Sequence, residues 1–146
     1  MGFSVSGSAA IIFLSLFIAF GMLYTTADNS FNSVFDAQDD QTDGALEMKN
    51  TNITVGSTDY SDPSDELTIT ANNTGATALS LNATSLLVDN SLAQGWEANA
   101  SVDSNEKTDL WLPGETVTIT VSKTSQPARV SLTTASGVSA TAEVAT

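Results

Sequence analysis

The residue types that carry out most acid–base and metal chemistry are scarce in this sequence. It contains no histidine, the commonest general base and metal ligand, and no cysteine for thiolate sites or disulfides. Serine and threonine are plentiful, but a hydroxyl nucleophile needs an adjacent base. Asp59, Asp62 and Asp65 lie in a turn-rich stretch, where solvation explains them better than catalysis. No glycine-rich phosphate loop follows a predicted strand. The sequence therefore predicts a protein that is not an enzyme, with no catalytic residues, metal site or cofactor.

Acidic residues dominate the charge. Seventeen Asp and Glu face four Lys and Arg, which gives a net charge of −13. This charge argues against nucleic acid and anionic lipid surfaces as partners, because both need positive residues. A surface so rich in aspartate suits high salt, where the screening length falls to about 3 Å at 1 M. We therefore expect a halophilic source, with an acidic binding face as the alternative.

Four Asn-x-Ser/Thr triplets are candidate N-glycosylation sites, since none has proline in the middle. They can be used only if this part of the chain lies outside the cytoplasm. Their acceptor residues are Asn52, Asn72, Asn82 and Asn99.

The first 27 residues must position the rest of the chain. Residues 5–27 carry no charged side chain and, at a helical rise of 1.5 Å per residue, reach roughly 35 Å, enough to cross a membrane. We therefore predict a transmembrane helix over residues 1–27. A cleaved signal peptide is the alternative, but the start has no Lys or Arg and the apolar part is long. Removal of Met1 and Gly2 alone, as in pilin precursors, is a third interpretation.

The composition changes abruptly at Asp28. Phe31, Val34 and Phe35 continue a helical apolar face, so residues 28–44 are predicted to form an amphipathic acidic helix or connector that stops at Gly44. This face is a candidate helix-partner contact. It would pack either on the chain's own domain, which we favour as the ordinary arrangement, or on another subunit, for which a homodimer is one candidate.

Beyond Gly44 the apolar residues recur with a period of two. Short runs rich in Val, Ile and Thr, separated by turn residues, predict antiparallel strands. Two sheets packed on their apolar faces are the economical result, so residues 45–146 are predicted to be a β-sandwich. The apolar pairs that define the runs include Leu46 and Met48, Ile53 and Val55, Leu67 and Ile69, Leu79 and Leu81, Leu86 and Val88, Leu110 and Leu112, Val117 and Ile119, Val130 and Leu132, and Val138 and Ala140.

Two tryptophans differ in their surroundings. Trp111 lies inside an apolar run and is predicted to be a core residue. Trp96 lies in the irregular, polar stretch of residues 95–108, and we select it as a candidate protein contact because exposed aromatic residues are common in interfaces.

Several stretches together resemble a known family. They are the apolar start MGFSVSGSAAIIFLSLFIAFGMLY, the acidic helix end, LTITANNTGATALSLNATSLLVDN and DLWLPGETVTITV. This combination is similar to the haloarchaeal archaellum (archaeal flagellum) protein F family, FlaF-like. The resemblance implies one membrane helix and an immunoglobulin-like β-sandwich outside the cell. It also implies a stator that binds the surface-layer protein and holds the motor stationary. No contact residue of the family can be matched to a position here.

The resemblance sets the expected location and partners. We expect a single-pass protein of the cell membrane, with the N-terminus cytoplasmic and the β-domain extracellular (pseudoperiplasmic). The expected partners are the membrane, the surface-layer protein and other archaellum envelope components such as protein G. The alternative function is a filament subunit of pilin or archaellin type, or a polymerising partner like protein G.

Overall fold

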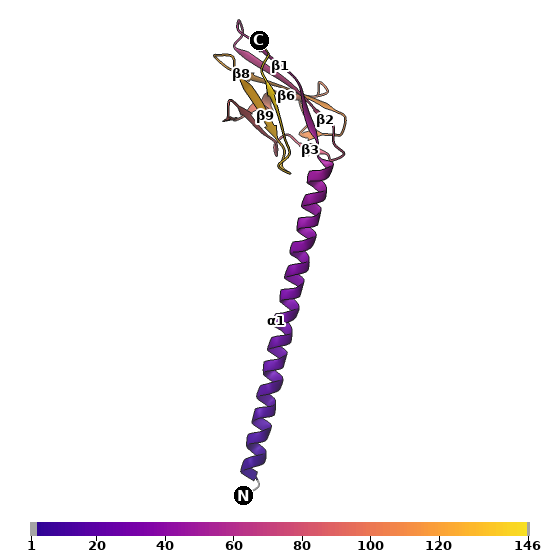
Figure 1. Ribbon diagram of the computed structural model, residues 1–146, viewed down its shortest axis with the longest axis vertical. Coiled ribbons are helices and arrows are strands. Elements are labelled where there is room, and N and C mark those ends of the chain that lie inside the picture. Colours follow the sequence, from indigo (N-terminus) through magenta and orange to yellow (C-terminus); the bar gives the residue numbers. More distant parts are fainter. Residues whose placement is uncertain (1–2, 146) are drawn as a thin grey trace. The chain divides into compact units, whose positions relative to one another are not determined.

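The computed structural model describes residues 3–145, and its contacts divide the chain into two compact units, Met1–Asp43 and Gly44–Thr146. The first unit is helical and belongs to α1 (Phe3–Asn50), the long helix of Figure 1. The second unit holds the last turns of α1 and all the strands.

The apolar start forms helix because its residues satisfy their own backbone groups. The hydroxyls that interrupt it bond back to carbonyls in the preceding turn: Ser15 Oγ donates to Ile11 O at 2.8 Å and Thr25 Oγ1 to Gly21 O at 2.8 Å. These polar side chains therefore do not break the helix.

The predicted helix stop at Gly44 is wrong. The helix continues to Asn50, so the run containing Leu46 and Met48, predicted as a strand, is its last part. A glycine inside a helix lowers its stability by only about 1 kcal/mol relative to alanine, which the surrounding helix-forming residues outweigh. Alternate apolar residues in so short a run fit a helix as well as a strand.

The second unit is an antiparallel β-sandwich of two four-stranded sheets and one small ladder. One sheet has the order β1-β2-β8-β6, and the other has the order β10-β9-β4-β5, while β3 pairs with β7 alone. The strands are β1 (Ile53–Ser61), β2 (Glu66–Asn73), β3 (Leu79–Ser80), β4 (Ser85–Val88), β5 (Ser91–Ala93), β6 (Ala100–Val102), β7 (Leu110–Trp111), β8 (Thr116–Ser122), β9 (Arg129–Thr133) and β10 (Ser139–Glu143).

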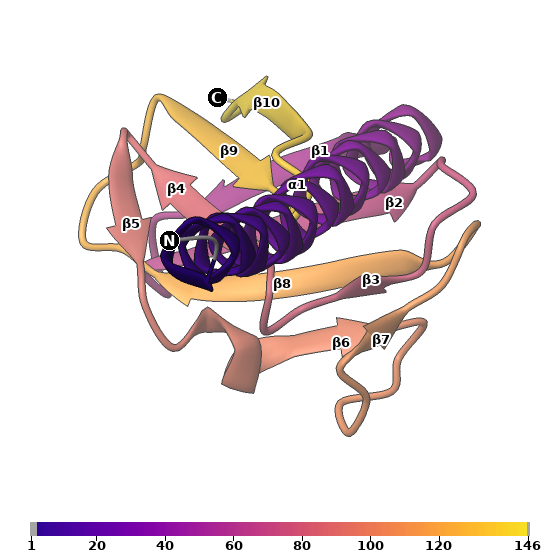
Figure 2. The same cartoon turned by 90° about the horizontal axis from the view of Figure 1, so that it is seen from below.

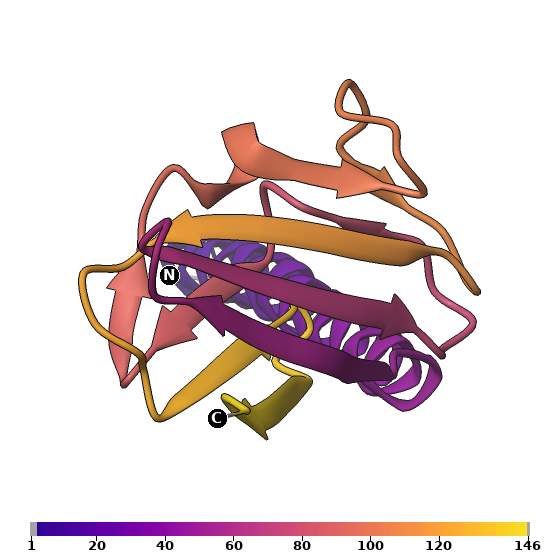
Figure 3. The ribbon, with the colours of Figure 1, turned by 90° about the horizontal axis from the view of Figure 1, so that it is seen from above.

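The strand register places the apolar side chains of each sheet on one face, which is buried in the core between the sheets. The end views show β1, β2 and β8 side by side (Figures 2 and 3), and Ile69 of β2 pairs with Ile119 of β8 at the centre of their ladder. Both side chains are fully buried, as are Leu86 and Leu132, which pair between β4 and β9 in the other sheet. The predicted class, mainly β with an N-terminal helix and an immunoglobulin-like sandwich, is confirmed.

Two details of the predicted strand pattern need correction. In β7 it is Trp111 that is buried, whereas Leu110 and Leu112 are 49% and 41% exposed. The predicted core position of Trp111 is therefore confirmed, but the apolar face assigned to its two leucine neighbours is wrong. The irregular stretch after residue 95 also holds structure: a 3-10 helix, η1 (Trp96–Asn99), leads into β6.

Candidate interaction surfaces

The N-terminal helix presents an apolar surface on all sides. Among the described residues, α1 is the one helix long and apolar enough to cross a membrane, and none of its apolar window is buried. Phe13, Phe17 and Phe20 are between 65% and 75% exposed. Such side chains are stable in hydrocarbon and unfavourable in water, so this surface needs a lipid or protein environment.

The face predicted to contact a helical partner is also exposed. Phe31, Val34 and Phe35 are 64%, 55% and 60% exposed. Within the helical unit these side chains therefore pack against nothing, and the predicted contact, with the chain's own domain or with another subunit, stays a prediction.

Within the second unit, the end of α1 joins the sandwich through backbone hydrogen bonds. Thr51 N donates to Glu47 O at 2.9 Å, a helical hydrogen bond that closes the last turn of α1. Asn50 O then accepts from Ala76 N at 2.7 Å, and Asn52 O accepts from Thr74 N at 2.9 Å. The loop after β2 therefore holds the helix end and the start of β1 together. We call this side of the sandwich the near end.

Two residues make the near end possible. Gly75 lies so close to the helix end that a Cβ there would be 2.5 Å from Asn52 N and 2.6 Å from Asn50 O. Asn73 is fully buried, and its Nδ2 donates to Thr77 O at 2.9 Å and to Trp111 O at 3.1 Å, while its Oδ1 accepts from Gly75 N. One side chain thus ties the loop to β7, which fixes the junction.

The opposite side of the sandwich, the far end, is formed by three turns. They connect β1 to β2, β4 to β5, and β8 to β9. Lys123 N donates to Asp65 O at 2.7 Å, and Tyr60 Oη donates to Lys123 O at 3.0 Å, so the first and third turns are bonded to each other.

The β4–β5 turn is bonded to the same group. Asp89 Oδ1 accepts from Ala128 N at 2.9 Å and from Arg129 N at 3.1 Å, and Arg129 Nη2 donates to Asn90 Oδ1 at 2.6 Å. Asp89 and Asn90 have φ of 50° and 65°, which these two residue types adopt more readily than most. The far end is therefore a set of short loops fixed by hydrogen bonds.

The far end also has a distinct electrostatic character. Lys123 and Arg129, two of the four basic residues in the chain, lie here among aspartates. Desolvation, and then the neighbouring Asp65 carboxylate, raise the pKa of Tyr60, so its hydroxyl stays protonated and donates at neutral pH. Both charge signs therefore meet on these bonded loops.

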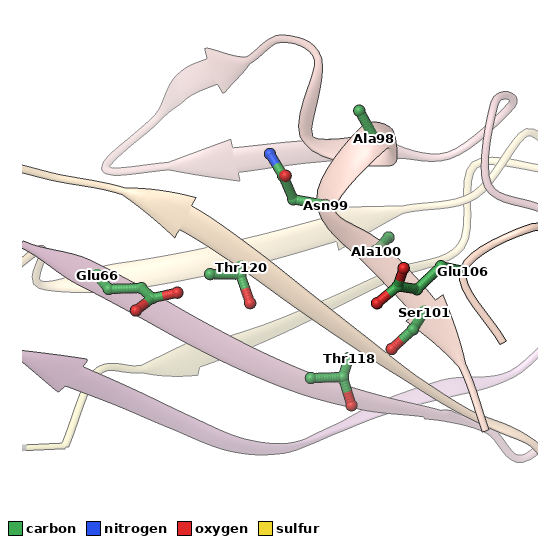
Figure 4. Close-up of a pocket in the computed structure, with 8 residues that line it drawn as sticks. All are labelled: Glu66, Ala98, Asn99, Ala100, Ser101, Glu106, Thr118 and Thr120. Carbon is green, nitrogen blue, oxygen red and sulfur yellow. The ribbon is translucent and has the colours of Figure 1, made fainter. Parts of the chain in front are cut away.

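A shallow groove of about 340 Å³ lies on the outer face of the first sheet. Figure 4 shows Thr118 and Thr120 of β8 in this groove, with Glu66 of β2 and Glu106 of the loop after β6 near its edges. Its hydroxyls and carboxylates can accept hydrogen bonds from a ligand, and the carboxylates can attract a cation. No group of three or more metal-ligating residues occurs in the described part of the chain.

A second polar cluster holds the β3–β7 ladder. Asp109 Oδ2 accepts from Ser80 Oγ at 2.7 Å, and its Oδ1 accepts from Asn82 N at 2.8 Å. The hydrogen bond from the Ser80 hydroxyl, and then the one from Asn82 N, stabilise the charged carboxylate and lower the pKa of Asp109 from its ordinary value of 3.8. The cluster stabilises the turn that presents Asn82.

The four candidate glycosylation sites differ in access. Asn82 and Asn99 are exposed, in a turn and in η1. Asn52 is exposed too, but its Nδ2 donates to Thr74 Oγ1 at 2.9 Å. Asn72 is half-buried within β2. As a proposal, modification would therefore favour Asn82 and Asn99.

The candidate contact at Trp96 is wrong, because the structure buries this side chain to 3% exposure in the core. Gly95, with φ of 70°, turns the chain so that the first residue of η1 points inward. The polar neighbours that suggested exposure occupy the outside of the same short helix. Sequence reasoning also missed the far end, whose loops are joined by backbone and Asx bonds that leave no apolar pattern.

Comparison with known proteins gives distant structural likenesses. No protein-family model matches the sequence, and no curated protein matches it. A solved structure of the archaellum periplasmic stator protein FlaG from Sulfolobus acidocaldarius has 15% identity and a TM-score of 0.45, over 63% of this chain and 97% of that chain.

Two further structures are similar at the same level. The archaellum periplasmic stator protein complex of FlaF and FlaG from Sulfolobus acidocaldarius gives 15% identity and a TM-score of 0.43, over 62% of this chain and 85% of that chain. The CARDB domain of a Pyrococcus furiosus protein gives 16% identity and a TM-score of 0.38, over 66% of this chain and 93% of that chain. The proposed function therefore rests on this chain's own residues.

Proposed function

We propose that this chain is a membrane-anchored structural component of the archaeal motility machinery, whose β-domain binds the surface layer and holds the motor stationary. One observation carries the anchoring part of the proposal. The part of α1 before Asp28 is uncharged and long enough to span a membrane, and the same helix continues without a break to an end that is hydrogen-bonded to the β-sandwich. The archaellum-specific part rests on the sequence resemblance to the protein F family.

The proposed organisation assigns one role to each segment. Residues 1–27 cross the cell membrane once, residues 28–44 form an acidic helical connector, and residues 45–146 form the extracellular β-domain. The N-terminus is cytoplasmic. The chain has no histidine or cysteine, and in this proposal it works by binding and not by catalysis.

The far end is the proposed contact with the surface layer. A stator must resist torque, so its contact surface has to be rigid. The far-end loops are fixed by the bonds of Asp89 and Lys123, whereas an unbonded loop would move under load. They also lie at the opposite end of β1 and β2 from the helix junction. Other envelope components, such as protein G, would then contact the side of the sandwich or the helix.

A binding experiment tests this assignment. The full chain in lipid vesicles should bind isolated surface-layer protein in molar salt. Ser125→Arg, in the exposed β8–β9 turn, should reduce binding at least tenfold, a loss typical of disturbing a contact surface centre. Ala135→Arg, in the exposed turn between β9 and β10 at the near end, adds the same charge and should leave binding unchanged.

A motility experiment separates the stator from the alternative. Loss of the protein should stop swimming, and a form released by a cleavable signal peptide in place of residues 1–27 should not restore it. If the released form restored swimming, or if vesicles carrying the chain did not bind the surface-layer protein, the stator role would be wrong. A filament subunit would instead be abundant in purified filaments.

A further inference from the structure

The helical unit carries a continuous uncharged seam. From Phe17 to Gln41, residues spaced alternately by three and four positions fall on one side of α1, the spacing at which two helices wind around each other. No member is charged. The seam consists of Phe17, Phe20, Tyr24, Ala27, Phe31, Val34, Gln38 and Gln41.

Four of the five acids of the connector lie away from this seam, and the fifth, Asp28, flanks it beside Ala27. At 100° per residue, the positions flanking it between residues 30 and 42 are Ser30, Phe35, Ala37 and Thr42, none of which is charged. Every acid between residues 30 and 43 falls on the opposite side of the helix. These acids are Asp36, Asp39, Asp40 and Asp43.

Within the helical unit, Phe3 to Asp43, the seam side chains have no partner. Phe31 and Val34 are more than half exposed, and the side-chain amides of Gln38 and Gln41 make no hydrogen bond there. Further towards the N-terminus, Phe13, Leu16, Phe17 and Phe20 line a hollow on the helix surface. These four residues have the spacing of the hole that accepts a side chain from a facing helix in a parallel coiled coil.

The chemistry of the seam fits a second copy of the same chain. In a parallel pair each seam residue meets its own counterpart, which excludes charged residues because like charges would face each other. A glutamine can meet itself, because its amide both donates and accepts. Two chains of charge −13 repel each other, but the seam keeps four of the five connector acids on the outside of the pair. Two chains anchored in one membrane with the same orientation are necessarily parallel.

We infer that two copies of this chain form a parallel dimer along the Phe17–Gln41 seam, with Gln38 and Gln41 setting the register. Phe31 and Val34 lie above the membrane, where the hydrophobic effect favours their burial between the two helices. Within lipid the aromatic residues contribute packing alone. The inference rests on the membrane anchoring in the proposed function and is independent of surface-layer binding.

The absence of cysteine allows a clean crosslinking test. Single substitutions Val34→Cys and Gln41→Cys on the seam are compared with Asp36→Cys and Asp43→Cys on the acidic side. The full chain is placed in vesicles at low protein-to-lipid ratio in molar salt and oxidised. The seam variants should form disulfide dimers at least about tenfold faster, because bridging needs the two Cα atoms within about 7 Å. Equal rates in all four variants, or no dimer in any, would overturn the inference.

A matched charge test asks whether the seam itself drives pairing. Gln38→Glu places like charges face to face and should convert dimers to monomers, counted by single-molecule photobleaching in vesicles. Ser33→Glu adds the same charge on the opposite side and should leave the dimer intact. If both variants, or neither, lost the dimer, seam pairing would be wrong. Monomers that still bound the surface layer would reject the dimer and leave the proposed function standing.

Discussion

At the scale of single residues, Asn73 is the side chain on which the near end depends most. Replacing it by alanine removes two hydrogen bonds from buried carbonyls and one from Gly75 N. We expect Asn73→Ala to lower the free energy of unfolding by about 1–3 kcal/mol per group left unsatisfied. Denaturant unfolding followed by tryptophan fluorescence measures this, because both indoles lie in the core.

The neighbouring asparagine is the control for this prediction. The buried Oδ1 of Asn72 has no hydrogen-bond partner among the described residues. Asn72→Ala therefore removes an unsatisfied polar atom and should change the free energy of unfolding by less than about 1 kcal/mol. A larger loss for Asn72→Ala than for Asn73→Ala would show that the near end is held in another way.

Gly75 tests the close approach of the loop to the helix end. Gly75→Ala places a Cβ against two backbone atoms that cannot easily move, at 2.5 and 2.6 Å. We expect a loss of about 1–3 kcal/mol in the same unfolding measurement, as for other overpacked sites. Gly44→Ala is the matched control, since nothing lies within 4 Å of its Cβ and alanine favours helix. If Gly75→Ala unfolded at the same denaturant concentration as wild type, the loop would not be packed tightly against the helix end.

Asp109 gives the sandwich a specific acid sensitivity. The pKa of Asp109 is lower in the folded protein than in the unfolded chain, where it is near 3.8. The charged carboxylate therefore stabilises the fold fully above that value, and the stabilisation is lost as the pH falls through the folded pKa. Between about pH 5 and about pH 2, wild type should lose more stability than Asp109→Asn, which cannot titrate. If fluorescence-detected unfolding gave equal losses of stability in the two proteins, Asp109 would not be the source of the acid sensitivity.

Prediction from sequence was reliable where apolar periodicity alone decides the position of a residue. Trp111 and the alternating residues of β2 and β8 were placed correctly, because an apolar side chain within a strand has one buried face to occupy. Trp96 was misplaced because a turn, set by Gly95, determines its direction. The Asn73 bonds were not predictable, since they connect residues far apart in the chain through backbone carbonyls.

At the scale of elements, the helix was predicted in kind but not in its end. Gly44 and the alternation of Leu46 and Met48 both indicated a change to strand, whereas the helix ends at Asn50. What ends it is the loop after β2, whose backbone N–H groups bond to Asn50 O and Asn52 O. A boundary fixed by tertiary contacts leaves little trace in local sequence.

The orientation of the helix in the membrane can be measured directly. Ser125→Cys lies in an exposed turn of the β-domain, and Ser4→Cys lies near the N-terminus. With no native cysteine to interfere, an impermeant thiol reagent should label Ser125→Cys in intact cells and Ser4→Cys only after lysis. The reverse pattern would place the β-domain in the cytoplasm and end its proposed contact with the surface layer.

At the scale of the whole molecule, net charge sets the conditions under which the fold is stable. Seventeen acids and four basic residues leave most carboxylates without a cationic neighbour, so they repel one another. The resulting destabilisation depends on screening, which acts over about 10 Å at 0.1 M salt and about 3 Å at 1 M. A core of this size leaves only a modest margin of stability, since domains of about 100 residues are marginally stable.

We therefore expect the melting temperature of the β-domain in the full chain to rise with salt, steeply up to about 1 M and weakly beyond it, where screening is nearly complete. Tryptophan fluorescence in a non-ionic detergent reports this transition without contribution from the helix, which has no tryptophan. Sucrose at matched osmolality controls for general exclusion from the surface. A charge-neutralised variant, with Asp59, Asp62 and Asp103 changed to Asn, should gain stability in dilute buffer and respond less to salt. If wild type melted at one temperature throughout, or if sucrose gave the whole effect, carboxylate repulsion would not govern its stability and the expectation of a halophilic source would be lost.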